Sequence, residues 1–432
     1  MGGRHSMVAG RAQAAQRSRA AGGRHRAQRA ATEAPRANAG ARNGSGFGLL
    51  AAKGAAVLAI AAGILVGTAG STSPEVSAPA PPTTICDAAP MNKADKAGCD
   101  ALLAMPDLRD EVSSLMNDGK GDIFDGLADI ATAPRNDILG ANAGPVLAEQ
   151  TAQAVISPEG AISQSEGGGT CGATSLERSW VAVNRGGFTQ AVENLSGPGG
   201  EHLLPSGTTL TLQEELFTEA PLQDRTTLLE RVVAPAMMDY ALYSGAEIGY
   251  DAANDVNELD NKYSGLTKEE TANLASAIFN EPYVVVQAGA WADDRAAEDQ
   301  GTPMSSVEQA EARAAIKWLH QLDGQGAPVQ ISMALDPSNL KEPGLHALTI
   351  APSVDGQIGV SNPWGQVTPT LPAESYEQAT GMPITNPALG RQSASNQWLD
   401  QALAGVVAPQ RLLQNVPGLD PITPTVSSDG IS

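Results

Sequence analysis

The stretch HALTIAPSVDGQIGVSNPWG, residues 346–365, decides the fold class that this sequence predicts. Residues 346–351 and 358–361 are short apolar runs typical of strands, and the SVDG segment at 353–356 can form a hairpin turn between them. A hairpin of this length brings Asn362 back beside His346. The amide oxygen of Asn362 can then accept a hydrogen bond from the imidazole and fix its tautomer.

Segments on either side of this hairpin extend the pattern. Hydrophobic periodicity predicts helices within 100–157, 173–183, 222–276 and 305–322. Short β-branched or apolar runs predict further strands at 283–288, 327–335 and 366–370. Helices that come mostly before strands indicate an α+β fold, with a helical subdomain followed by an antiparallel β subdomain.

Cys171 is the candidate nucleophile because it directly precedes the predicted helix at 173–183. A sulfur at the positive end of a helix dipole has a lowered pKa, which favours the thiolate. The glycines before it, which end at Gly169, let the backbone turn tightly and leave the sulfur open to a substrate, and Gly169 and Gly172 are expected to support the site. A base must lie nearby, and His346 can be held rigidly by its strand.

The other histidines fit this role less well. Two of the five lie in the first 25 residues, His202 lies in a loop bounded by Gly and Pro, and His320 ends a charged helix. Such positions are typical of surface or structural histidines.

A Cys that starts a helix, a His that starts a strand and the NPWG motif at 362–365 together resemble the papain-like cysteine peptidases. The Pro in this motif is most similar to the calpains, as is the apolar segment VAPAMMDYA at 233–241. The opening CGATSL at 171–176 also resembles bacterial leader-peptide peptidases of the same clan. The resemblance covers about residues 160–372. It implies a papain-like domain, which we place at 158–415, in which Trp364 shields the Asn–His hydrogen bond from water.

Two features depart from the family pattern. The family's oxyanion-hole Gln lies six residues before the Cys, whereas Gln164 lies seven before Cys171. The glycines at 167–169 can absorb one residue, so the resemblance implies that Gln164 is the oxyanion donor. Cys171 and His346 are 175 positions apart, and the acidic stretch at about 245–275 is interpreted as an insertion between the motifs. The resemblance implies no cofactor and no metal.

The N-terminal residues differ sharply in charge from the rest. Residues 1–53 carry ten Lys and Arg against Glu33, a net of +9, so the remainder of this chain of net charge -21 carries -30. Because the residues after 53 are so acidic, we do not expect them to bind nucleic acid or anionic membrane surfaces. Residues 47–70 are apolar and come after a basic arm at 1–46, an order that keeps the arm in the cytoplasm and exports the rest of the chain. A retained membrane anchor and a cleaved signal segment both fit this pattern.

Two cysteines come after this segment. Residues 71–99 form a Pro-rich linker, and in an oxidising compartment Cys86 and Cys99 are natural partners for a disulfide, which leaves Cys171 as a free thiol. Residues 100–157 are expected to be a helical pro-region or subdomain, and 416–432 a disordered tail. The protein is therefore expected to be a single-pass membrane protein with an extracellular catalytic domain, or a secreted one.

The predicted activity is the cleavage of peptide bonds in a protein or peptide substrate, through a Cys–His–Asn triad and a thioester acyl-enzyme. One alternative is a cell-wall amidase or transglutaminase-like acyltransferase that uses the same Cys–His pair. Another is a non-catalytic envelope scaffold. Asn362 followed by Trp364 favours the peptidase.

Overall fold

The computed structural model describes residues 85–87, 90–164, 169–218, 227–246, 250–251, 256–257, 265–287, 306–322, 328–335, 345–413 and 416. All of them belong to one compact unit, 77–432. The predicted cytoplasmic arm at 1–46, the apolar segment at 47–70, most of the linker and residues 417–432 of the predicted tail lie outside the described residues. Among the helices that the structure describes, none combines the length and hydropathy needed to cross a bilayer.

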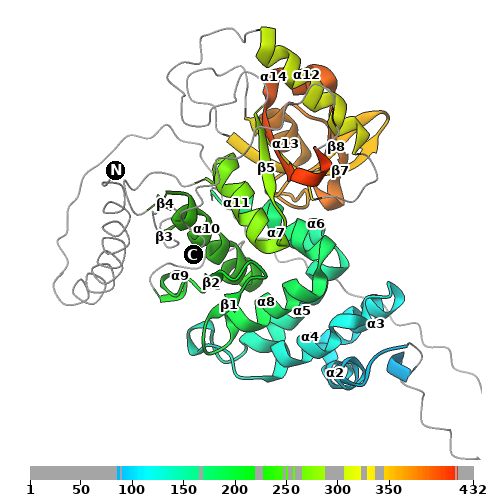
Figure 1. Ribbon diagram of the computed structural model, residues 1–432. Coiled ribbons are helices and arrows are strands. Elements are labelled where there is room, and N and C mark those ends of the chain that lie inside the picture. The colour runs from blue at the N-terminus through cyan, green and yellow to red at the C-terminus, as the bar shows by residue number, and fades with distance from the viewer. Residues whose placement is uncertain are drawn as a thin grey trace, which may run out of the picture. The chain divides into compact units, whose positions relative to one another are not determined.

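Helices make up most of the N-terminal half of the described chain (Figure 1). They are α2 (Lys93–Leu103), α3 (Arg109–Asn117), α4 (Phe124–Thr132), α5 (Ala143–Ile156), α6 (Pro158–Ala161), α7 (Cys171–Val183), α8 (Arg185–Ser196), α9 (Glu215–Thr218), α10 (Leu228–Ala246) and α11 (Lys268–Phe279). One continuous hydrophobic core joins the early helices to α7, α8 and α10, with Phe124, Leu147 and Trp180 among its fully buried side chains. The predicted helical region at 100–157 therefore packs in the same core as the helix that begins at Cys171.

The Cys86–Cys99 disulfide is present, as the sequence predicted, with the two Cα atoms 6.0 Å apart. Both residues are buried in the helical core, Cys86 just before α2 and Cys99 within it. The bond closes a short loop, which stabilises the fold by about 3 kcal/mol in the chain-entropy model. Cys171 is the remaining, free cysteine.

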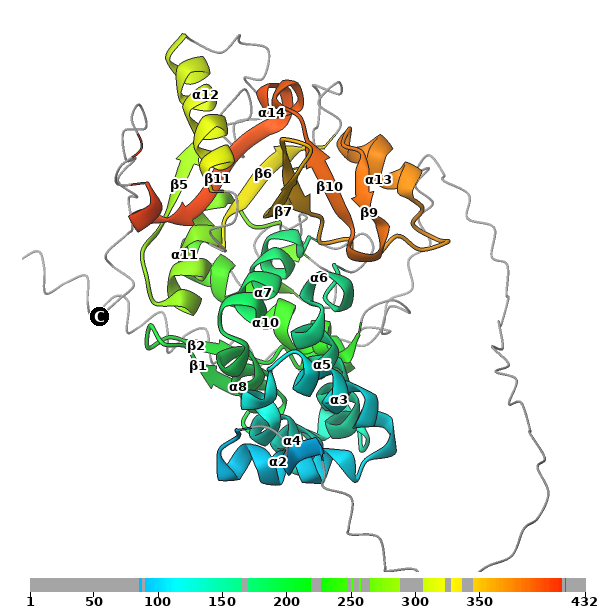
Figure 2. The ribbon, with the colours of Figure 1, turned by 90° about the vertical axis from the view of Figure 1, so that its right-hand side faces the viewer.

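The C-terminal half is built on a seven-stranded antiparallel sheet, with strand order β5-β11-β6-β7-β8-β10-β9 (Figure 2). Its strands are β5 (Tyr283–Gln287), β6 (Gln330–Ala334), β7 (Leu345–Val354), β8 (Gln357–Ser361), β9 (Ile384–Asn386), β10 (Arg391–Ala394) and β11 (Leu403–Pro409). Helices α12 (Ser306–Gln321) and α14 (Asn396–Ala402) share a second hydrophobic core with the sheet. The predicted α+β class with an antiparallel sheet is confirmed, and β7, which carries His346, is the central strand.

The hairpin predicted from 346–365 is also confirmed. Strands β7 and β8 pair antiparallel, and Val354 faces Gln357 across a two-residue turn. The turn residues Asp355 and Gly356 both have positive φ, 52° and 77°, which is the conformation of a type I′ turn. This turn twists in the same sense as the strands. A register shift between Ala351 and Val354 follows it and places Ile350 opposite Val360. The turn and this irregularity together determine where Asn362 emerges from the end of β8.

Two predicted elements are wrong. Residues 366–370 form no strand, because Pro369 and Pro372 supply no backbone donor and the chain closes into a turn with paired hydrogen bonds between Thr368 and Leu371. The helical pattern at 222–276 is not continuous. Helix α10 ends at Ala246, the short strands β3 (Tyr250–Asp251) and β4 (Val256–Asn257) come next, and α11 begins at a capping box between Thr267 and Glu270.

Candidate active site

Helix α7 is the element that carries Cys171, and it is buried along nearly its whole length. Cys171 is its first residue and is 8% exposed. Ser175 and Arg178 come later at the spacing that places them on the same face of the helix as Cys171. Both of these side chains bind the β7–β8 hairpin, so the face of α7 that carries Cys171 is the face that meets the sheet.

Ser175 forms hydrogen bonds that join this face of α7 to β7, the strand that carries His346. Its Oγ donates to the carbonyl oxygen of Ala347 over 3.2 Å, and Oγ1 of Thr349 donates to the carbonyl oxygen of Ser175 over 3.1 Å. Ala347 directly follows His346, and Ser175 lies one turn after Cys171. Figures 1 and 2 both show α7 beside the sheet at β7. The two contacts therefore bring the start of α7 and the start of β7 together.

Arg178 forms hydrogen bonds that join the same face of α7 to the end of β8. Its guanidinium donates from Nη1 to Oγ of Ser361 and to the carbonyl oxygen of Asn362, both over 2.8 Å. Nε donates to the carbonyl oxygen of Ile162 over 2.8 Å, and Nη2 donates to the carbonyl oxygen of Glu159 over 3.1 Å. Burial lowers the pKa of Arg178 to about 10, so it stays charged at neutral pH. It joins α7, β8 and the segment before Gln164.

His346 and Asn362 are buried and hydrogen-bonded to each other. Nε2 of His346 lies 3.0 Å from Oδ1 of Asn362. The ring of Trp364 packs over the imidazole with centroids 4.9 Å apart and planes tilted by 32°. Its backbone N–H donates to the same Oδ1 over 3.1 Å. The predicted placement of Asn362 beside the imidazole, with Trp364 over the pair, is thus present in the structure.

The electrostatics favour a neutral imidazole. Burial lowers the pKa of His346 to about 4, although the hydrogen bond with Asn362 raises it. With Nε2 engaged by Asn362, Nδ1 is the ring nitrogen left for the thiol. A neutral imidazole at pH 7 is able to accept a proton from a thiol, and a thiolate beside it would in turn stabilise the charged ring.

Gln164 lies close to the Asn362 turn. Its backbone N–H donates to the carbonyl oxygen of Pro363 over 2.6 Å. The turn needs glycine at Gly365, where φ is +82° and a Cβ would lie 2.7 Å from Cβ of Ser163. This close approach holds the segment of Gln164 against the turn that follows Asn362, while the role of Gln164 as oxyanion donor stays a prediction.

The two glycines beside Cys171 are both described. Gly169 is buried in the bend that leads into the helix. Gly172 faces protein rather than an opening, since a Cβ there would lie 3.2 Å from Leu266 and 3.3 Å from Thr271. Glycine at 172 thus permits close packing between α7 and the segment around the start of α11.

The two other described histidines have local partners. Nδ1 of His202 lies 3.2 Å from Nδ2 of Asn194, and its ring lies near Trp180 in the helical core. Nε2 of His320 lies 2.7 Å from Oδ1 of Asn396 at the surface. Each is bound to an asparagine of another element, as expected of structural histidines.

Sequence reasoning missed a pair of buried acids. Glu230 accepts from Ser163, through N–H and Oγ, and from the N–H of Thr227. Glu177, on α7, is 0% exposed, and neither carboxyl oxygen has a hydrogen-bond partner among the described residues. Burial raises the pKa of Glu177 well above its ordinary value, and the nearby Glu230 raises it further, while Arg178 lowers it. Burial therefore favours the neutral form of Glu177.

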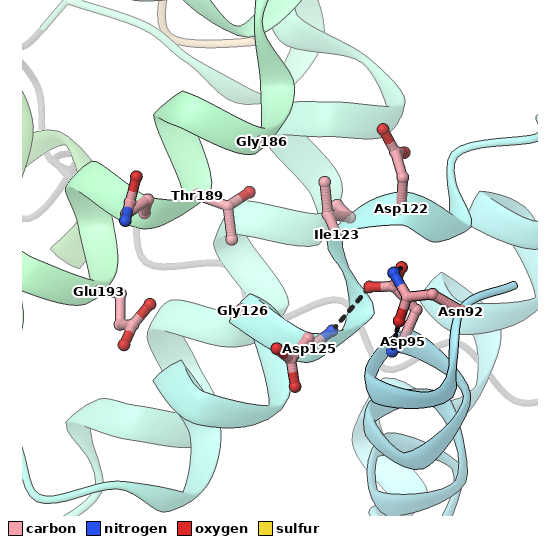
Figure 3. Close-up of a pocket in the computed structure, with 10 residues that line it drawn as sticks. Asn92, Asp95, Asp122, Ile123, Asp125, Gly126, Gly186, Thr189 and Glu193 are labelled. Carbon is pink, nitrogen blue, oxygen red and sulfur yellow. Dashed lines mark hydrogen bonds between the residues drawn. The ribbon is translucent and has the colours of Figure 1, made fainter. Parts of the chain in front are cut away.

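A polar pocket of about 290 Å³ lies elsewhere, among α2, α4 and α8 (Figure 3). Asp95, Asp125 and Glu193 are among its lining residues, and Asp95 accepts from Nδ2 of Asn92 and from the N–H of Asp125. It shares no residue with the cluster around His346. Within the described part of the chain, no group of His, Cys, Asp or Glu is arranged to hold a metal ion.

Comparisons with known proteins were negative. No protein-family model matches the chain, and neither a curated protein nor a solved structure is significantly similar to it. The function of this protein is therefore inferred from the contacts of its own residues.

Proposed function

We propose that this chain is a papain-like cysteine peptidase with Cys171 as nucleophile, His346 as base and Asn362 as the residue that orients the base. The observation that carries the proposal is the buried bond between His346 and Asn362 beneath Trp364, on the strand to which the Cys171 face of α7 is fastened. A thiol, an imidazole and an orienting amide in this order are the groups that nucleophilic acyl transfer requires.

The reaction can be written from these positions. Nδ1 of His346 takes the proton of the Cys171 thiol, and the thiolate attacks the carbonyl carbon of the scissile peptide bond. The tetrahedral intermediate collapses to a thioester as the imidazolium gives its proton to the departing amine. Water, deprotonated by the neutral imidazole, then attacks the thioester and releases the carboxylic acid and the thiol.

The oxyanion requires donors at the start of α7. Cys171 begins this helix, and the first backbone N–H groups of a helix can donate to a developing negative charge because they lie outside its internal hydrogen-bond pattern. The side-chain amide of Gln164 is proposed as the second donor. Removing one such donor typically lowers kcat by about 10²–10³.

The direct test is cleavage of a peptide library by the purified full chain, read by mass spectrometry. The wild type should produce cleaved peptides, and Cys171→Ala should produce none. Asn362→Ala should retain part of the activity, because thiol and imidazole remain. If Cys171→Ala cleaves as fast as the wild type, the proposal is wrong. Cleavage confined to cell-wall peptides would favour the amidase instead.

We further propose that the catalytic domain is exported. The Cys86–Cys99 disulfide fits an oxidising compartment, and the basic arm at 1–46 before the apolar segment at 47–70 fits export of the rest of the chain. A reporter enzyme fused after residue 90 should be active only outside the cytoplasm. Activity of that fusion in the cytoplasm would contradict export.

A further inference from the structure

A chain of hydrogen bonds continues from Asn362 into the interior of the sheet domain. Nδ2 of Asn362 donates to Oε1 of Gln392 over 2.9 Å. Gln392 lies on β10, the strand next to β8, and is 0% exposed. Its Nε2 donates in turn to the carbonyl oxygen of Met382 over 2.8 Å and to Oγ1 of Thr380 over 2.7 Å. No bond of the proposed reaction involves Gln392 directly.

At the Gln392 end of these hydrogen bonds, only one assignment of donors and acceptors is possible. The carbonyl of Met382 can only accept, so the end of Gln392 that faces it must be the NH₂ group. Oγ1 of Thr380 donates its single proton to the carbonyl oxygen of Tyr376 over 2.7 Å, so it too must accept from Gln392. Two acceptors thus orient Gln392 with its oxygen toward Asn362, which must present its own NH₂ group in return.

At the His346 end, the donors and acceptors are assigned in a way that agrees with the Gln392 end. The backbone N–H of Trp364 can only donate, and it donates to Oδ1 of Asn362. An amide oxygen carries no proton, so the bond between Oδ1 and Nε2 of His346 requires the proton on Nε2. Burial lowers the pKa of His346 to about 4, so the ring is neutral at pH 7 and carries one proton only. Nδ1 is therefore left with a lone pair.

We propose that Gln392 is a positioning residue that sets the tautomer of His346 through Asn362. Flipping the Asn362 amide would point its NH₂ group at the N–H of Trp364 and its oxygen at Oε1 of Gln392, so both contacts would be lost. The structure thereby leaves the lone pair on Nδ1, the atom that would accept the thiol proton. The use of this lone pair in catalysis rests on the proposed peptidase function, whereas the tautomer itself does not.

The experiment is ¹⁵N NMR of the full chain labelled in histidine, at pH 7, with the His346 signals assigned by their absence in His346→Gln. The wild type should show a protonated Nε2 and an unprotonated Nδ1. In Gln392→Met the two ring nitrogens should report a mixture of tautomers. The matched control is Gln366→Met, which removes an exposed glutamine bonded to Gly160 and should leave the wild-type signals unchanged.

Gln392→Glu provides the rescue. A protonated carboxyl still accepts from Asn362 through one oxygen, and its other oxygen donates one proton where the glutamine donates two, so at pH 5.5 this variant should keep the single tautomer. Alkylation of Cys171 by iodoacetamide should fall about tenfold in Gln392→Met and recover in Gln392→Glu. If Gln392→Met does not fold, the wild-type spectrum and the Gln392→Glu spectrum still decide.

A protonated Nδ1 in the wild type overturns the inference, as does a Gln392→Met variant that is folded and keeps the single tautomer. Neither result depends on turnover of a peptide. A protein with the expected tautomer that cleaves nothing would contradict the proposed function and leave the role of Gln392 standing.

Discussion

Arg178 donates from Nη1 to the carbonyl oxygen of Asn362 over 2.8 Å, and this bond joins the helix that begins at Cys171 to the third member of the proposed triad. Arg178 is 2% exposed, and its other hydrogen bonds go to Ser361, Ile162 and Glu159. One side chain therefore sets how α7 sits against the end of β8.

Replacing Arg178 by Met should destabilise the protein strongly. The change removes the guanidinium donor from the carbonyl oxygens of Ile162 and Glu159 and from the Ser361 hydroxyl, and an unsatisfied buried group costs about 1–3 kcal/mol. We expect a loss of at least ~3 kcal/mol in the free energy of unfolding by urea, together with a fall in kcat at temperatures where the variant is folded. Arg178→Lys should recover little, because a single ammonium cannot reproduce the planar fork.

The matched control for this change is Arg185→Met. Arg185 begins α8, is partly exposed and binds Asp122 at the surface. Surface ion pairs contribute about 0–1 kcal/mol, so this variant should remain close to the wild type in stability and kcat. Equal losses in the two variants would show that Arg178 has no special place in the fold.

Burial of His346 predicts a loss of stability in acid. The folded pKa is about 4 and the unfolded value is 6.5, so between these values the unfolded chain binds more protons. The contribution is fully present above pH 6.5 and is lost as the pH falls toward 4, by about 3 kcal/mol in total. Unfolding free energies of wild type and His346→Gln should therefore differ most in their slopes between pH 4 and 6.5. Parallel slopes would contradict the burial of a neutral imidazole.

The raised pKa of Glu177 predicts that its contribution to stability changes with pH in the opposite direction to that of His346. Its folded pKa is raised above the ordinary value, so its contribution is present below pH 4.5 and is lost as the pH rises through the folded pKa. Glu177→Met removes this loss, and it also removes the desolvation of a carboxyl without described partners. The variant should be more stable than the wild type at pH 8 by about 1–3 kcal/mol, and by less at pH 5.

The control for the Glu177 change is Glu374→Met, on the exposed surface of α13 (Ala373–Thr380). Surface substitutions of this kind typically change stability by less than about 0.5 kcal/mol. A Glu177→Met variant that is less stable than the wild type at both pH values would mean that the carboxyl has a stabilising partner.

The hairpin of His346 and Asn362 was predictable because its information is local. The turn residues Asp355 and Gly356 can both take positive φ, and they directly join the two runs that pair as β7 and β8. The α+β class could be predicted from the order of helical and strand patterns in the same way. The disulfide could be predicted from two close cysteines in a sequence with export features.

The remainder of the site depends on contacts between segments far apart in the chain. Arg178 and Gln392 meet Asn362 from positions 184 residues before it and 30 residues after it. The spacing of Cys171, Ser175 and Arg178 on one helical face was visible, but not which strand that face meets. After Ala246 the helix gives way to the paired strands β3 and β4. The helical periodicity across 222–276 gave no sign of this strand pairing.

The most direct test of the central claim is the rate at which a thiol-directed epoxide inactivates the full chain at pH 7, with the modified residue identified by mass spectrometry. The wild type should be labelled at Cys171 and lose its peptidase activity in proportion. In His346→Gln the rate should fall by about 10²-fold or more, because no imidazole remains to take the thiol proton. Cys171 labelled equally fast in both proteins, or not labelled in the wild type, would contradict a catalytic pair of Cys171 and His346.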